Sequence, residues 1–99
     1  LINTVKELSL KYIERNHKVC IIASNETLKE YLFDTTRVRV LNIGSRNDLF
    51  EVARNLFKVL RSVDYLQCDV AIAEGVEERG LGLAVMNRLR KAAEIKIVV

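Results

Sequence analysis

Two glycines ahead of an amphipathic segment form the pattern in this sequence best suited to binding a ligand. Gly80 and Gly82 follow an apolar run, residues 70–73, and precede a helical pattern that begins at Leu83. A strand, a glycine-bearing loop and a helix N-terminus in this order can hold an anion. The reason is that the first N–H groups of a helix are unpaired and its dipole places partial positive charge there. The N–H groups of residues 82–84 would then contact a phosphate.

The same two glycines also have a purely structural interpretation, which the spacing favours. The dinucleotide-binding fingerprint requires a third glycine, but Val85 stands at that position, and residues 75–79 make the loop long. In this interpretation Gly80 and Gly82 permit a tight turn and close packing of the helix. Both interpretations stay open at this point.

Ser24 and Asn25 are expected on the other side of such a site. Both follow the apolar run 19–23, which reads as a buried strand. In open parallel sheets, ligands bind beyond the carboxyl ends of the strands, where the strand order reverses. If strand 19–23 is central and pairs with strand 70–73, a crevice lies between Ser24-Asn25 and the loop 74–82.

The charged residues near this crevice favour ordinary solvated surfaces. Glu74, Glu77 and Glu78 could hold magnesium beside a phosphate, but the sequence shows no further ligands, so we expect a solvated loop. We predict no metal site.

Three basic residues, Arg88, Arg90 and Lys91, share the polar side of the last helix. They could dock a neighbouring domain, an acidic partner or RNA, or they could be a solvated face near a helix C-terminus. The net charge of +3 is mild and argues against nucleic-acid binding by bulk electrostatics.

Catalytic residues are not apparent in the sequence. No set of side chains combines a nucleophile, a base and an electrophilic group. Cys20 and Cys68 are too few and too far apart for a zinc site, so we expect two reduced, mostly buried thiols in a cytosolic protein.

The elements that position these residues follow from hydrophobic periodicity. We expect helices over about 4–15, 46–63 and 83–93 and strands over 19–23, 37–43, 70–73 and 97–99. A capping box formed by Thr4 and Glu7 begins the first helix, and Ser24 caps a short helix that carries Leu28, Tyr31 and Leu32. The core-facing residues of the long helix are expected to be Leu49, Phe50, Val52, Ala53, Leu56, Phe57, Leu60 and Val63.

Alternating strands and helices predict one α/β domain over residues 1–99. We expect a Rossmann-like open, mostly parallel sheet with helices on both faces, a three-layer αβα arrangement. The arginine alternation in strand 37–43 predicts a sheet edge or a partly solvated face. The first helix has no strand before it, so we expect a longer parent protein, in which either Leu1 and Ile2 are the remains of such a strand or the strand lies wholly outside these residues. No apolar run is long enough to span a membrane, and we expect a cytoplasmic protein with no membrane partner.

Two segments resemble the C-terminal domain of the long, two-domain form of threonylcarbamoyl-AMP synthase. They are ARNLFKVLRSVD at 53–64 and RGLGLAVMNRLRKAA at 79–93. The resemblance implies a parent enzyme, a nucleotidyltransferase, whose YrdC-like domain makes threonylcarbamoyl-adenylate from threonine, bicarbonate and ATP and releases pyrophosphate. The product serves threonylcarbamoyladenosine formation in tRNA processing.

For this chain the resemblance implies an accessory domain that packs against the YrdC-like domain and has no catalytic residue or cofactor of its own. ATP, with magnesium, belongs to the parent, and the tRNA-modification machinery is an indirect partner. A homodimer is also compatible with the sequence. The alternative is an independent nucleotide-binding or phosphate-binding α/β domain that uses the loop from Gly75 to Gly82.

Overall fold

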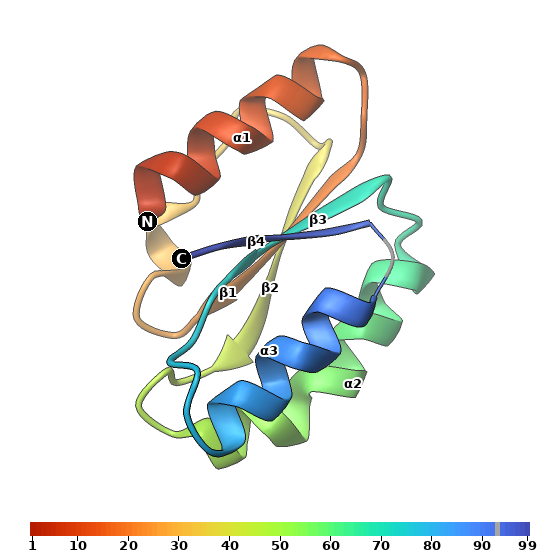
Figure 1. Cartoon of the computed structure of the whole chain (residues 1–99). Coiled ribbons are helices and arrows are strands. Elements are labelled where there is room, and N and C mark those ends of the chain that lie inside the picture. Colours follow the sequence, from red (N-terminus) through yellow and green to blue (C-terminus); the bar gives the residue numbers. More distant parts are fainter. Residues whose placement is uncertain (93) are drawn as a thin grey trace.

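The chain folds into a four-stranded sheet between two helical layers (Figure 1), in a computed structural model that describes residues 1–92 and 94–99. The elements in chain order are α1 (Ile2–Glu14), β1 (Val19–Ser24), the 3-10 turn η1 (Leu28–Glu30), β2 (Val38–Gly44), α2 (Leu49–Tyr65), β3 (Val70–Glu74), α3 (Leu81–Lys91) and β4 (Ile95–Val98).

The strands are all parallel and lie in the order β2-β1-β3-β4. β1 is therefore central and pairs with β3, with Val19 opposite Val70, so the condition for a crevice between their loops is met. β2 lies at one edge, where Arg39 is exposed, which confirms the edge predicted from its alternating arginines. The predicted α/β class is confirmed.

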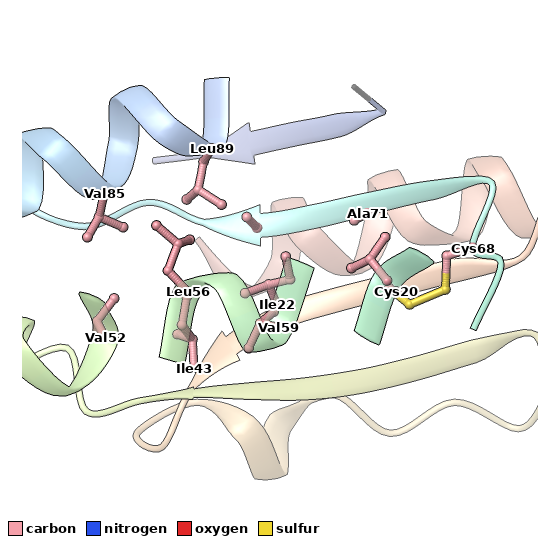
Figure 2. Packing of buried hydrophobic residues seen from close by; sticks show 12 residues of the cluster. Cys20, Ile22, Ile43, Val52, Leu56, Val59, Cys68, Ala71, Val85 and Leu89 are labelled. Atoms are coloured by element: carbon pink, nitrogen blue, oxygen red, sulfur yellow. A yellow bond between two sulfur atoms is a disulfide. The ribbon is translucent and has the colours of Figure 1, made fainter. Parts of the chain in front are cut away.

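Helices cover both faces of the sheet. α1 packs on one face, where Val5 joins Ile21 and Ile72 in a buried cluster. α2 and α3 pack on the other face, where Leu56 and Leu89 belong to a second cluster (Figure 2). β1 and β3 are buried along their whole lengths, which is why their sequences are apolar without alternation.

α1 begins earlier than the capping box predicted. Its first residue is Ile2 and Leu1 is its N-cap residue, so Thr4 lies inside the helix and the capping box is wrong. The Val5 N–H donates to the Leu1 carbonyl at 3.0 Å, so the backbone continues the helix upstream of Thr4. Ile2 also packs against the α1-side cluster, and this apolar contact favours the longer helix.

Phe50 and Phe57 are exposed, which corrects the prediction that they belong to the core. Their exposed fractions are 72% and 53%. The buried residues of α2 are Val52, Leu56, Val59 and Val63, which share one stripe. Phe57 is turned by about 100° from Leu56 around the helix and points away from the sheet. The apolar stripe around α2 is thus wider than the part of the helix surface that the sheet covers.

Cys20 and Cys68 form a disulfide, which corrects the prediction of two reduced thiols. Cys20 lies in β1, and Cys68 lies in the turn before β3, at the end of the α2–α3 cluster (Figure 2). The parallel pairing of β1 with β3 brings the two residues together across 48 positions of sequence. Spacing alone cannot show such an approach, because it depends on which strands are neighbours.

The last elements are shifted relative to the prediction. α3 begins at Leu81 and β4 runs over Ile95–Val98, two residues earlier than expected at its start. The predicted helix end at Ala93 lies outside the described residues. Among the described residues, no helix has both the length and the apolar composition needed to cross a membrane.

Candidate functional site

The carboxyl ends of β1, β2 and β3 meet at one edge of the sheet, where the sequence placed a crevice. From β1 the chain crosses to β2 over the α1 face, and from β2 it crosses to β3 over the opposite face. The strand order therefore reverses beside β1, which is the position where open α/β sheets bind ligands. The residues that surround this point decide what it can hold.

Ser24 and Asn25 lie at this point, and both are engaged by the protein itself. Ser24 is the last residue of β1 and not a helix cap as predicted, because η1 begins only after Thr27. The Ser24 N–H donates to a carboxylate oxygen of Glu74 at 3.1 Å. The exposed Asn25 accepts from the Asn42 amide at 2.5 Å, and its own N–H donates to the Gly44 carbonyl at 2.9 Å.

Glu74 is buried, which corrects the prediction that it belongs to a solvated acidic loop. It is the last residue of β3 and is only 6% exposed. The Thr27 hydroxyl lies 2.7 Å and 2.5 Å from its two carboxylate oxygens, and the Tyr31 hydroxyl donates to one of them. Glu74 thus joins β1, η1 and β3 through a hydrogen-bonded cluster.

The chemistry of this cluster favours a structural role. Burial, and next the hydrogen bond to the Glu74 carboxylate, raise the pKa of Tyr31 far above its ordinary value. A phenol in this environment stays protonated and donates a hydrogen bond to the Glu74 carboxylate. The Tyr31 phenol is therefore not available as a general base at neutral pH.

Sequence reasoning missed Glu74 because it was grouped with Glu77 and Glu78, which are exposed. The signal was its position directly after the apolar run 70–73, at the carboxyl end of a central strand. A residue at such a position is covered by the loops that follow the neighbouring strands, so its carboxylate must find donors in them.

Gly80 and Gly82 differ in what they do. Gly80 precedes α3 with φ of 53°, and a Cβ there would meet open space. A Cβ on Gly82 would overlap the carbonyl oxygen of Glu77 and lie 3.2 Å from a Leu49 methyl carbon. The Gly82 N–H also donates to the Arg79 carbonyl at 3.0 Å. These contacts give Gly82 a packing role; ligand binding by either glycine stays a prediction.

Arg46 and Glu26 connect the loops across the crevice, and sequence reasoning missed both. The Arg46 guanidinium donates to the Gly75 carbonyl at 2.5 Å. The Glu26 carboxylate accepts from the Arg46 N–H at 2.9 Å and from the Ser45 hydroxyl at 2.7 Å. The Arg46 N–H and then the Ser45 hydroxyl lower the pKa of Glu26. The loops at this end of the sheet are therefore bonded to one another.

Acidic and basic groups elsewhere around the crevice are paired on the surface. Glu77 pairs with Arg79, and Glu78 pairs with Arg90 at 2.5 Å. Within the part of the chain that the structure describes, no cluster of three or more His, Cys, Asp or Glu side chains could hold a metal ion.

The three basic residues predicted as a docking face have different environments. The Arg88 guanidinium lies 5.4 Å from the centre of the Phe57 ring, as in a cation–π contact. Arg90 pairs with Glu78, and Lys91 is exposed. The structure thus associates one of the three cations with an exposed aromatic side chain.

An apolar hollow lies between α2 and α3 beside this contact. Its volume is about 250 Å³, and it is lined by Ala53, Leu56, Phe57, Leu81, Ala84, Val85 and Arg88. Phe50 lies two turns before Phe57 on the same side of α2. We call Phe50, Ala53, Phe57, Ala84 and Arg88 the aromatic face. An exposed surface with aromatic and arginine side chains has the composition of a protein interface core.

The family model for the C-terminal domain of threonylcarbamoyl-AMP synthase matches residues 2–94. The chain belongs to this family. The threonylcarbamoyl-AMP synthase of Pyrococcus abyssi is 46% identical over 94 residues, which are 95% of this chain and 25% of that protein. The enzyme of Bacillus subtilis is 33% identical over 95% of this chain and 26% of its own length. The chain thus spans about a quarter of the curated relatives that it matches.

A solved structure of the same family shares the fold. The crystal structure of the C-terminal Sua5 domain from a Pyrococcus horikoshii hypothetical Sua5 protein superimposes with a TM-score of 0.67 and is 41% identical. The match covers 98% of this chain and 84% of that chain. The resemblance seen at residues 53–64 and 79–93 is thereby confirmed as family membership.

Within this threonylcarbamoyl-AMP synthase C-terminal domain, the predicted site residues separate into two groups. Ser24, Asn25 and Gly82 lie at the carboxyl end of the sheet and contact neighbouring loops. Arg88, Arg90 and Lys91 lie on α3, and Arg88 borders the aromatic face. The first group contacts neighbouring loops of the protein itself, whereas Arg88 of the second group lies beside an exposed apolar surface.

Proposed function

We propose that this chain is the accessory domain of a threonylcarbamoyl-AMP synthase and performs no chemistry itself. The observation that carries the proposal is the family match over residues 2–94 together with a span of only about a quarter of the relatives. In this proposal a YrdC-like domain of the same polypeptide makes threonylcarbamoyl-adenylate from threonine, bicarbonate and ATP with magnesium. The product serves tRNA modification in the cytoplasm.

The chemistry of the crevice supports a non-catalytic role. The buried carboxylate of Glu74 is occupied by donors from Ser24, Thr27 and Tyr31. The glycine that would have to admit a phosphate, Gly82, is instead in contact with the Glu77 carbonyl. Both features favour a structural role over a nucleotide site, and tight ATP binding by this chain would instead support the alternative of an independent nucleotide-binding domain.

The aromatic face is the surface that we propose docks on the YrdC-like domain. Phe50 exposes most of its surface and Phe57 about half, and the Arg88 guanidinium lies over the Phe57 ring. Aromatic and arginine side chains dominate binding energies at protein interfaces when they become desolvated. Lys91 follows Arg88 by three residues on α3 and would form part of the charged rim of this contact, whereas Arg90 lies on the other side of α3, toward β4.

The first test compares the complete synthase with the chain of 99 residues. Side-chain footprinting should show Phe57 less reactive in the complete synthase, because the docked domain covers it. Equal reactivity of Phe57 in the two proteins would contradict docking through this face.

The second test uses variants of the complete synthase. Phe57→Ser and Arg88→Glu should lower pyrophosphate release from ATP, threonine and bicarbonate by loosening the docked arrangement. Leu32→Ser and Lys11→Glu are matched controls, because Leu32 is 83% exposed and Lys11 lies on α1, across the sheet. Unchanged activity in both aromatic-face variants would reject a functional role for the docking.

A further inference from the structure

Three basic side chains form a row along the outer side of α2, beside the aromatic face. The members of this cationic row are Arg54, Lys58 and Arg61. Each follows a buried residue of α2 by two positions, which corresponds to about 200° around the helix. The row therefore faces away from the sheet, and all three side chains are exposed. Tyr65, which is 88% exposed, follows the buried Val63 in the same way and continues the row by one turn.

The cationic row has no acidic counterpart on α2. In the part of the chain that the structure describes, no ion pair includes a member of the row. The acidic residues within α2 are Glu51 and Asp64. The Glu51 carboxylate accepts from the Ser45 N–H at 2.6 Å, so it is bonded to the loop before the helix. Asp64 lines a hollow of about 340 Å³ on the α3 side, together with Arg88 and Lys91.

The outer row of α1 shows how an ordinary solvated helix face of this protein is charged. Its exposed members with the same spacing are Glu7, Lys11 and Glu14, which alternate in sign. Alternating charges of this kind support a solvated helix through pairs of neighbours. The row on α2 has a single sign and lacks such pairs, so solvation of the helix does not account for it.

The cationic row and the aromatic face form one continuous surface. Arg54 precedes Phe57 by three residues and Arg61 follows it by four, so their Cβ atoms lie about 5–6 Å from that of Phe57. On the other side of Phe57, the Arg88 guanidinium lies 5.4 Å from the ring centre, and Lys91 follows Arg88 by three residues. An exposed aromatic ring is thus flanked by basic groups from both helices.

A partner seated on the aromatic face must also cover these basic groups. A stable interface buries about 800 Å² of each partner, whereas an aromatic side chain supplies only about 150–250 Å². The contact therefore extends from Phe50 and Phe57 onto their basic neighbours. Cations that lose water need acceptors, since a desolvated charge without a partner is strongly unfavourable. A surface that is apolar at its centre and acidic around it meets both requirements.

We infer that this surface of α2 and α3 docks on an acidic surface of the YrdC-like domain in the same polypeptide. The inference rests on the proposed function for the identity of the partner, and it adds the charge that the partner presents. Attraction between opposite charges then orients the two domains, and the aromatic side chains supply the apolar contact.

RNA is the other polyanion that basic and aromatic side chains can bind. The net charge of this chain is only +3, which is low for a nucleic-acid-binding domain. The centre of the surface is an apolar hollow of about 250 Å³, which suits an apolar side chain better than a phosphate. An acidic protein surface is therefore the better match, and RNA is an outcome of the test.

Salt dependence in the complete synthase tests the acidic partner. Side-chain footprinting reads Phe57 and Tyr65 at about 0.1 and 1 M sodium chloride, between which the Debye length falls from about 10 to 3 Å. The distant Leu32, which is 83% exposed, serves as the internal reference. We expect Phe57 and Tyr65 to be protected at low salt and to lose this protection at high salt.

Charge reversal tests the same contact at low salt. Arg54→Glu/Arg61→Glu should abolish the protection of Phe57, and Arg54→Gln/Arg61→Gln should weaken it less, because neutral side chains do not repel an acidic surface. Lys11→Glu/Lys29→Glu is the matched control, since it changes the net charge equally at exposed positions on the α1 side. The control should leave Phe57 protected. The salt comparison needs no variant, so it holds even if a double variant fails to fold.

Three results would overturn the inference. Protection of Phe57 that neither salt nor charge reversal changes would mean docking on a surface without acidic groups, which leaves the proposed function intact. If Phe57 is instead as reactive in the complete synthase as in the chain of 99 residues, docking itself fails, and the proposed docking surface is rejected with it. Protection of Phe57 and Tyr65 that appears only after tRNA is added would assign the cationic row to RNA.

Discussion

Tyr31 donates its hydroxyl hydrogen bond to the carboxylate of Glu74, 43 positions further along the chain. The contact joins the segment after β1 to the carboxyl end of β3, the two central strands. A carboxylate that is 6% exposed needs such donors, since a buried acceptor without them costs about 1–3 kcal/mol. The cluster occupies the place where related folds bind ligands, and here it holds the loops together.

Glu74→Gln should lower the free energy of unfolding by about 1–3 kcal/mol. The amide group would present N–H donors to hydroxyl donors, so at least one hydrogen bond is lost. Denaturant unfolding monitored by circular dichroism measures the change. Glu77→Gln is the matched control, because the Glu77 side chain is 62% exposed and should alter stability by less than about 0.5 kcal/mol. Equal effects of the two substitutions would contradict the buried role of Glu74.

Stability should fall at high pH through Tyr31. Its pKa is raised in the folded protein above the ordinary value of 10.0, so the folded state keeps the proton while the unfolded state releases it. The contribution of Tyr31 is therefore complete below pH 10 and is lost progressively above it. Unfolding curves between about pH 9 and 11.5 should show a smaller decline for Tyr31→Phe than for the unmodified protein. Identical declines would mean that Tyr31 titrates freely.

The disulfide between Cys20 and Cys68 should stabilise the domain by about 2–4 kcal/mol, because it closes a long loop in the unfolded chain. Unfolding with and without dithiothreitol measures this difference. The double variant Cys20→Ala/Cys68→Ala is the control, and reductant should leave its stability unchanged. Two reactive thiols in the native, unreduced protein would contradict the bond.

Phe57→Ala should cost less than about 1 kcal/mol in the isolated domain, whereas Leu56→Ala should cost about 2–5 kcal/mol. The two residues are neighbours on α2, but Leu56 is 4% exposed and Phe57 is 53% exposed. Thermal unfolding of the two variants makes the comparison. A large loss from Phe57→Ala would return Phe57 to the core and remove it from the aromatic face.

ATP should bind to this chain no more tightly than about 100 μM, roughly −5.5 kcal/mol. Gly82→Val should lower stability without affecting nucleotide binding, because its side chain would overlap the Glu77 carbonyl. Calorimetric titration with ATP and with pyrophosphate measures the affinity. Tighter binding that Gly82→Val abolishes in a folded protein would establish a nucleotide site in the loop from Gly75 to Gly82.

The sequence by itself determined the elements and the class of fold. Short apolar runs such as residues 19–23 and 70–73 are typical of strands buried on both faces, and the helical periodicity between them favours parallel pairing. These patterns depend only on residues close in sequence, so they can be recognised without knowing which elements pack together. The alternating arginines pointed to the edge position of β2, whereas the pairing of β1 with β3 was only a condition of the predicted crevice and was decided by the tertiary structure.

Only the tertiary structure decided which polar and aromatic residues are buried. From the sequence, Glu74 and Glu77 were assigned to the same solvated loop, and Phe57 and Leu56 to the same core-facing side of a helix. Residue type and periodicity do not distinguish the members of either pair. Burial instead depends on which strand, loop or helix lies opposite: η1 and β1 cover Glu74, whereas α3 reaches Phe57 only through the Arg88 side chain and leaves 53% of Phe57 exposed. The contact of Cys20 with Cys68 has the same origin, since strand order brings together residues that are 48 positions apart.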